Sequence, residues 1–125
     1  MGVRVLGIDI GTTGVRAAIF DASGSLLADA SVPCPVDAPE AGWAQVYPEA
    51  WWRAARRVLA ELAASAGAAR LSEVTAIGVV GQAPTLAVVD AKGDAIEPAI
   101  LWLDTRRLSR RRRQASALVR RRRWR

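Results

Sequence analysis

The sequence lacks histidine altogether and has a single cysteine, Cys34, among its 125 residues. These shortages exclude a disulfide within the chain, zinc sites built from cysteine and histidine, and acid–base chemistry by an imidazole. Any catalysis must therefore use carboxylates, hydroxyls, arginines or a bound metal ion.

Long hydrophobic runs are also missing. No segment approaches the roughly 18 consecutive apolar residues that a membrane span needs. The N-terminus runs straight into Val3-Arg4-Val5-Leu6 without the layout of a signal peptide. We therefore expect a cytoplasmic protein. With 51% apolar residues, its length suits one globular domain or a piece of a larger one.

Acidic residues are absent from the last part of the chain. Residues 1–105 contain seven basic and all twelve acidic residues, a net charge of −5, whereas residues 106–125 contain eleven arginines and no acid. The overall charge of +6 thus describes only the end of the chain. We predict a domain over residues 1–105 and an Arg-rich tail over residues 106–125 that is disordered or the product of a shifted reading frame.

Three strands are predicted near the N-terminus, over residues 3–10, 15–21 and 26–32. Each is rich in aliphatic or β-branched residues, and glycine-containing turns separate them. Because residues 5–10 are almost continuously apolar, the first strand is expected to be central and covered on both faces.

A helix is predicted over residues 48–66, where apolar residues recur at helical spacing between Pro48 and Gly67. A buried strand over residues 74–80 follows, and then a hairpin-like excursion with strands at 86–90 and 99–102. The order β-β-β-α-β predicts an α/β fold with a mixed sheet. The expected core consists of Val5, Ile8, Ile10, Ile19, Val58, Leu62, Ile77 and Val79.

A turn of small and hydroxyl residues, Gly11-Thr12-Thr13-Gly14, separates the first two strands. Backbone N–H groups and threonine hydroxyls in such a turn can bind phosphate oxygens. Asp9 lies just before it, where a carboxylate near phosphates requires a divalent cation between them, so we expect Mg²⁺ bound directly or through water. Arg16 could reach the same phosphates.

The alternative interpretation is an ordinary hairpin turn with carboxylates at the strand ends, since short glycine patterns are weak signals. The sequence has neither a G-x-x-x-x-G-K-[ST] P-loop nor a G-x-G-x-x-G motif. Nucleotide binding of those two kinds is therefore excluded.

Three stretches, taken in order, resemble a known family. GIDIGTTGVRAAIFD is similar to the first phosphate motif of the actin-like ATPases, in the form found in FGGY carbohydrate kinases such as xylulokinases. GWAQVYPEAWW resembles the segment leading into that family's first helix. VTAIGVVGQAPTLAVVDAKGDAIEPAILWLDTRR resembles its next strand, Gly-Gln sugar loop, hairpin and following tryptophan segment. The resemblance covers residues 3 to about 107.

The resemblance implies a fragment of an actin-like ATPase (ribonuclease H-like) domain and ATP-dependent phosphorylation of a sugar or polyol. It places Asp9 near the magnesium of the nucleotide, and Thr12, Thr13 and Arg16, with Gly11 and Gly14 of the same turn, near its phosphates. It places Gln82 in the sugar site, and Asp104 and Arg106 close to substrate hydroxyls.

Two departures limit the substrate assignment. Xylulokinases tend to continue the Gly-Gln pair with Met-His and glycerol kinases with Arg-Glu, whereas this chain has Ala83-Pro84. Leu103 also replaces a residue that is commonly polar in xylulokinases. The expected acceptor class is therefore a pentulose, a hexulose or a related polyol.

By resemblance, the catalytic aspartate and the adenosine pocket lie beyond residue 125, so no catalytic residue is assigned within the chain. We expect a truncated or frame-shifted kinase fragment without activity of its own. The alternative is a noncatalytic fragment whose tail, residues 106–125, binds nucleic acid or acidic surfaces nonspecifically. The sequence does not predict an oligomeric state.

Overall fold

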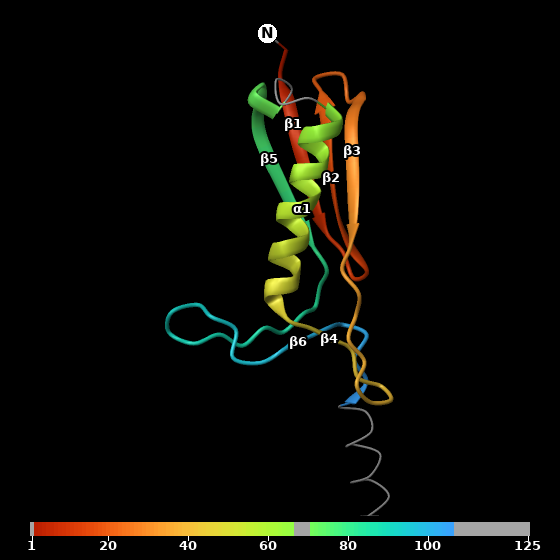
Figure 1. The fold of residues 1–125 in the computed structure, drawn as a ribbon, viewed down its shortest axis with the longest axis vertical. Coiled ribbons are helices and arrows are strands. Elements are labelled where there is room, and N and C mark those ends of the chain that lie inside the picture. The colour runs from red at the N-terminus through yellow and green to blue at the C-terminus, as the bar shows by residue number, and fades with distance from the viewer. Residues whose placement is uncertain (1, 67–70, 107–125) are drawn as a thin grey trace, which may run out of the picture.

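The computed structural model describes residues 2–66 and 71–106. Its main body is a four-stranded sheet in the order β3-β2-β1-β5 with one long helix against it (Figure 1). The elements are β1 (Arg4–Ile10), β2 (Gly14–Asp21), β3 (Leu26–Pro33), β4 (Gln45–Val46), α1 (Pro48–Ala66), β5 (Val74–Gly81) and β6 (Ala99–Ile100).

The sheet is mixed, as the sequence predicts. β1 pairs antiparallel with β2, and β2 pairs antiparallel with β3. After the crossover through α1, β5 pairs parallel with β1. This pairing makes β1 a central strand, with the turn at its C-terminal end and the end of β5 at the same edge of the sheet.

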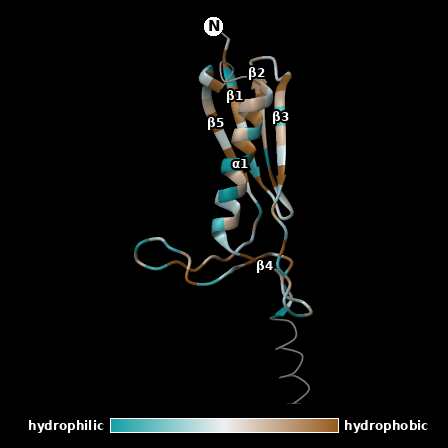
Figure 2. Cartoon of the chain, in the orientation of Figure 1, coloured by the Kyte–Doolittle hydropathy of each residue, from teal (hydrophilic) through white to brown (hydrophobic). Residues whose placement is uncertain are grey.

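Helix α1 begins at Pro48, where a missing N–H costs nothing, and covers one face of the sheet. Its buried residues, Ala54, Ala55, Val58 and Leu62, repeat at helical spacing and pack mainly against β2 and β3. The strands they cover are predominantly hydrophobic in Figure 2. Nowhere in residues 2–66 and 71–106 is a helix both long and apolar enough to span a membrane.

The predicted core is correct in part. Ile19, Val58 and Leu62 are fully buried, and Ile8 and Ile10 are partly buried against the same core. The remaining three are exposed: Val5 by 36%, Ile77 by 63% and Val79 by 67%.

The cause of the exposure is the position of α1. The helix lies over β2 and β3 and leaves β5 uncovered on either face within the described part of the chain. The expectation that the first strand is covered on both faces is therefore wrong for these residues, because the face containing Val5 and Asp9 is open.

A second, two-stranded sheet lies beside the N-terminal end of α1, where β4 pairs antiparallel with β6. The hairpin-like excursion predicted after β5 is present only as isolated bridges, Leu86 with Ile100 and Val89 with Ala95. Residues 107–125, which include most of the predicted Arg-rich tail, lie outside the described residues.

Candidate functional site

The turn between β1 and β2 is tight. The Gly11 N–H donates to the carbonyl of Gly14 at 2.9 Å, and the Cys34 N–H donates to the carbonyl of Thr13 at 2.9 Å. A Cβ atom added to Gly14 would lie 2.8 Å from the backbone oxygen of Val32, a separation that real Cβ atoms essentially never show. The closing glycine is therefore required by the approach of β3.

A polar cavity of about 430 Å³ opens at this turn. The six residues that the sequence assigns to the metal and the phosphates all line it. The lining consists of Asp9, Gly11, Thr12, Thr13, Gly14, Arg16, Ser31, Val32 and Pro33. The fold thus brings the whole predicted phosphate-binding set to one place.

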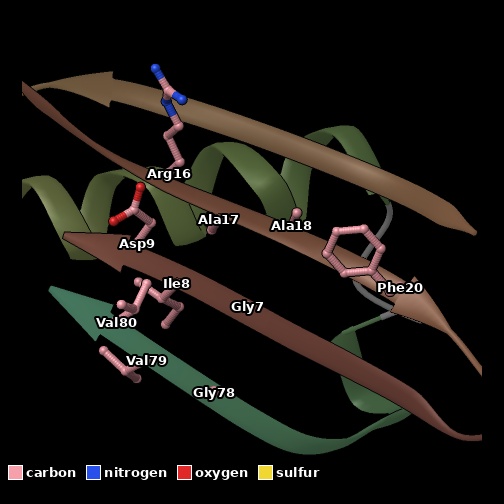
Figure 3. A pocket seen from close by; sticks show the side chains of 10 residues that line it. All are labelled: Gly7, Ile8, Asp9, Arg16, Ala17, Ala18, Phe20, Gly78, Val79 and Val80. Carbon is pink, nitrogen blue, oxygen red and sulfur yellow. The ribbon is translucent and has the colours of Figure 1, made fainter. Parts of the chain in front are cut away.

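Asp9 and Arg16 face each other across β1 and β2, where they are paired in the strand register. Alternation along each strand places both side chains on the face opposite α1, and Figure 3 shows them together near one end of the strands. Both are exposed. An anion entering the cavity would meet the guanidinium of Arg16 directly, whereas the carboxylate of Asp9 would need a cation between.

The donor set near Asp9 bears on the kind of metal site. In the described residues, no group of three or more aspartate, glutamate, cysteine or histidine side chains could enclose a metal ion. A single carboxylate fits Mg²⁺, which usually keeps several waters and uses one or two carboxylates together with substrate phosphates. The arrangement therefore fits a magnesium–nucleotide complex and not a cage made only of protein ligands.

Gln82 lies directly against the turn, although 70 residues separate it from Thr12. Its backbone N–H donates to the Ile10 carbonyl at 3.1 Å, extending the pairing of β5 with β1. Its side-chain Nε2 donates to the Gly11 carbonyl at 3.3 Å, and its Oε1 accepts from the Thr12 hydroxyl at 3.2 Å. The residue predicted for the sugar site thus bonds three consecutive residues at the edge of the phosphate cavity.

Trp102 is a residue of the site that the sequence did not indicate. Its indole Nε1 donates to Thr12 Oγ1 at 3.1 Å, although the ring is more than half exposed. The sequence does not reveal this contact, because 90 residues separate Trp102 from Thr12. Trp102 brings the segment after β6 to the phosphate turn.

Asp104 and Arg106 bond to each other and to the segment before β4. The Asp104 carboxylate is 2% exposed and accepts hydrogen bonds from the Arg106 side chain and from the Ala44 N–H at 2.7 Å. Arg106 also donates to Gln45 Oε1 at 3.1 Å and stacks over the Trp43 ring at 4.0 Å from its centroid. The two residues therefore hold the backbone of residues 102–106, which includes Trp102, in place.

Opposing influences set the pKa of Asp104. Burial of the carboxyl raises its pKa, but the hydrogen bonds from Arg106 and Ala44 and the charge of Arg106 outweigh that effect, so the pKa lies below its ordinary value of 3.8. The carboxylate is therefore ionised at neutral pH.

A second hollow, of about 460 Å³, lies on the open face of the sheet. Its lining is mostly apolar and meets the phosphate cavity at Asp9 and Arg16 (Figure 3). The remaining lining residues are Gly7, Ile8, Ala17, Ala18, Phe20, Gly78, Val79 and Val80.

Comparison with known proteins identifies the family of the chain. Residues 4–116 match the model of the N-terminal domain of the FGGY family of carbohydrate kinases. The xylulose kinase of Escherichia coli K12 is 34% identical over 101 residues, which are 81% of this chain and 20% of that enzyme. The glycerol kinase of Rhodospirillum centenum is 41% identical over 109 residues, 85% of this chain and 22% of that enzyme.

The solved structures agree. The crystal structure of xylulose kinase from Rhodospirillum rubrum has a TM-score of 0.74 and 37% identity, covering 82% of this chain and 21% of that one. The chain therefore spans about a fifth of the length of these relatives. Its α/β mixed sheet is part of the actin-like ATPase fold. The chain belongs to the FGGY family of carbohydrate kinases.

Proposed function

We propose that this chain provides the phosphate-binding part of an ATP-dependent carbohydrate kinase that phosphorylates a hydroxyl of a pentulose, a hexulose or a related polyol. One observation carries the proposal: a single polar cavity gathers Asp9, the turn from Gly11 to Gly14, and Arg16. Membership of a family named for carbohydrate kinases supports the reaction class.

In this proposal the turn binds the terminal phosphates of ATP. The backbone N–H groups around Thr12 and Thr13 and the Thr13 hydroxyl donate to phosphate oxygens, and the Arg16 guanidinium neutralises their charge. Asp9 binds Mg²⁺, directly or through water. When bound, Mg²⁺ neutralises charge that develops during phosphoryl transfer.

The acceptor is assigned to the region of residues 82–86 and 102–106, which contact the phosphate turn through Gln82 and Trp102. Gln82 opens the first of these segments, and the Asp104–Arg106 pair stabilises the second. Gln82, Asp104 and Arg106 are accordingly proposed as the residues of this chain on the acceptor side. Xylulose and glycerol, the substrates in the names of the relatives, are the first acceptors to test.

The test is calorimetric titration of ADP into the purified chain with and without Mg²⁺. We expect binding that requires Mg²⁺ and is weakened at least about tenfold by Asp9→Asn, because the neutral amide no longer attracts the cation. Asp29→Asn is the matched control, since Asp29 lies on β3 and does not line the cavity. Binding that ignores both Mg²⁺ and the Asp9 substitution would refute the proposal.

The acceptor class is tested separately by calorimetric titration of ketoses, polyols and aldoses into the chain saturated with Mg-ADP. Binding of ketoses or polyols, but not of aldoses of the same length, supports the class. Binding of none of the panel members to a preparation that binds Mg-ADP contradicts it.

Nonspecific binding of nucleic acid is a second candidate function, favoured by the eleven arginines and no acids of residues 106–125. The match to the kinase family model extends to residue 116, which is beyond the predicted domain boundary at residue 105, and that boundary stays a prediction. The cytoplasmic location also stays a prediction. Binding to random DNA that weakens steeply with salt, and that disappears when residues 107–125 are deleted, would support this function. The absence of binding at low salt would exclude it.

A further inference from the structure

The hydrogen bonds around Thr12 have only one consistent direction. The Gly11 carbonyl can only accept, so the amide NH₂ of Gln82 must face it, which leaves Gln82 Oε1 to accept from the Thr12 hydroxyl. The indole N–H of Trp102 can only donate, so Thr12 Oγ1 must be its acceptor. The chain of donors therefore runs from Trp102 through Thr12 to Gln82.

This direction has a chemical consequence for Thr12. A threonine hydroxyl has one proton, and the Thr12 proton is used in the bond to Gln82. Ionised phosphate oxygens act as acceptors, so the Thr12 hydroxyl cannot donate to a phosphate without breaking that bond. By contrast, no described residue bonds the exposed hydroxyl of Thr13, which lines the same cavity.

Gln82 is suited to holding the turn. Its three bonds go to Ile10, Gly11 and Thr12, three successive residues leading into the phosphate turn. The two side-chain bonds, at 3.2 and 3.3 Å, are slightly longer than is usual for bonds of their kinds and would shorten with a small shift of the turn toward Gln82. Gln82 is partly buried at this contact.

We propose that Gln82 and Thr12 are positioning residues of the phosphate turn, with Trp102 as the third member of the network. The Thr13 hydroxyl and the backbone N–H groups are the donors that contact phosphate. The network joins the start of the acceptor-side segment at residue 82 to the phosphate turn, so displacement of one shifts the other. This inference rests on the proposed function and refines it by separating Thr12 from Thr13.

The first test needs no nucleotide. In a ¹H–¹⁵N spectrum of the chain, the indole signal of Trp102, identified with Trp102→Phe, is one of five. We expect Thr12→Val and Gln82→Met to shift that signal and leave the other four in place, and Thr12→Ser to restore it. If Thr12→Val leaves the Trp102 signal unmoved, the network is absent and the inference fails.

The second test is a double-mutant cycle on the dissociation constant of Mg-ADP. Because Thr12→Val and Gln82→Met remove the same bond, each should weaken binding by roughly tenfold, and the double variant should lie within about threefold of the weaker single variant. Thr13→Val removes a separate donor. In the double variant with Gln82→Met, the two fold-increases in the dissociation constant of Mg-ADP should therefore multiply. Losses that multiply for Thr12→Val and Gln82→Met would overturn the inference.

Controls keep this result separate from the proposed function. Thr75→Val removes a bond of the same kind between β5 and β1, from Thr75 Oγ1 to the Arg4 carbonyl, at the other end of the sheet, and should leave Mg-ADP binding unchanged. Failure of the unmodified chain to bind Mg-ADP would refute the proposed function, and the positioning role with it. Binding by the unmodified chain together with independent effects of Thr12 and Gln82 would refute the inference alone.

Discussion

At the scale of single residues, the phosphate turn depends on a glycine that β3 leaves no room to replace. We predict that Gly14→Ala lowers the free energy of unfolding by about 1 to 3 kcal/mol, because its Cβ would press on the Val32 carbonyl, a backbone atom that moves only with its strand. The same shift would widen the phosphate turn and weaken Mg-ADP binding.

Urea unfolding followed by tryptophan fluorescence measures the change in stability. Gly78→Ala is the control, since an added Cβ there meets no atom within 4 Å. It should keep or slightly raise the midpoint, because alanine restricts the unfolded chain more than glycine does. Equal midpoints for the two variants would show that contact with the Val32 carbonyl does not destabilise Gly14→Ala.

The different roles proposed for the two threonines illustrate the limit of sequence reasoning at this scale. Thr12 and Thr13 are adjacent and identical, and the sequence predicts the same role for both. They are distinguished by partners 70 and 90 residues away, Gln82 and Trp102. Hydrogen-bond partners so distant in sequence depend on the packing of segments that local patterns do not describe.

At the scale of elements, the predictions were correct where a hydrophobic pattern continues over many residues. The helix, predicted from Pro48 to about residue 66, is found at Pro48–Ala66, because its apolar spacing continues between a proline and a glycine. The observed bounds of the first three strands differ from the predicted bounds by at most one residue at either end. The two-residue strands β4 and β6 were missed or misplaced, because pairing this short is determined by tertiary contacts and not by strand propensity.

The contact between the segment before β4 and the segment after β6 should be sensitive to acid. The pKa of Asp104 is lowered in the folded protein, so the carboxylate stabilises the fold above its ordinary value of 3.8. This stabilisation is lost as the pH falls below that value through the folded pKa. The free energy of unfolding should therefore fall more steeply below about pH 4 in the unmodified chain than in Asp104→Asn.

Urea unfolding at a series of pH values measures this difference. At pH 7, Asp104→Asn should be less stable by about 1.5 to 3 kcal/mol, because it loses charged hydrogen bonds with Arg106, and the two curves should converge in acid. The indole ¹H–¹⁵N signal of Trp43, which Arg106 stacks on, gives a local signal for the same contact. Parallel curves over the whole pH range would exclude Asp104 as the cause.

At the scale of the whole molecule, the sheet has two unlike faces. α1 buries one face over β2 and β3, while the other holds Asp9 and Arg16 beside an apolar hollow. The exposed residues of β5 follow from the same arrangement, because this strand is at the edge of the described sheet and α1 lies mainly over β2 and β3. The sequence predicts the apolar character of β5 but not which of its faces a helix covers.

The exposed β5 leads to a prediction about association. Ile77 and Val79 are 63% and 67% exposed on a strand with one edge that no other described strand pairs with, a combination that favours pairing between chains. We expect the chain to associate as its concentration rises. The double variant Ile77→Thr, Val79→Thr should associate only at concentrations at least about fivefold higher. Threonine is chosen because it removes apolar surface and keeps the strand propensity. The paired control, Leu86→Thr with Ile96→Thr, removes comparably exposed side chains from the excursion after β5 and should have little effect. Sedimentation velocity over a concentration series measures the difference, and an equal effect of the two pairs would assign association to general hydrophobicity instead of the β5 edge.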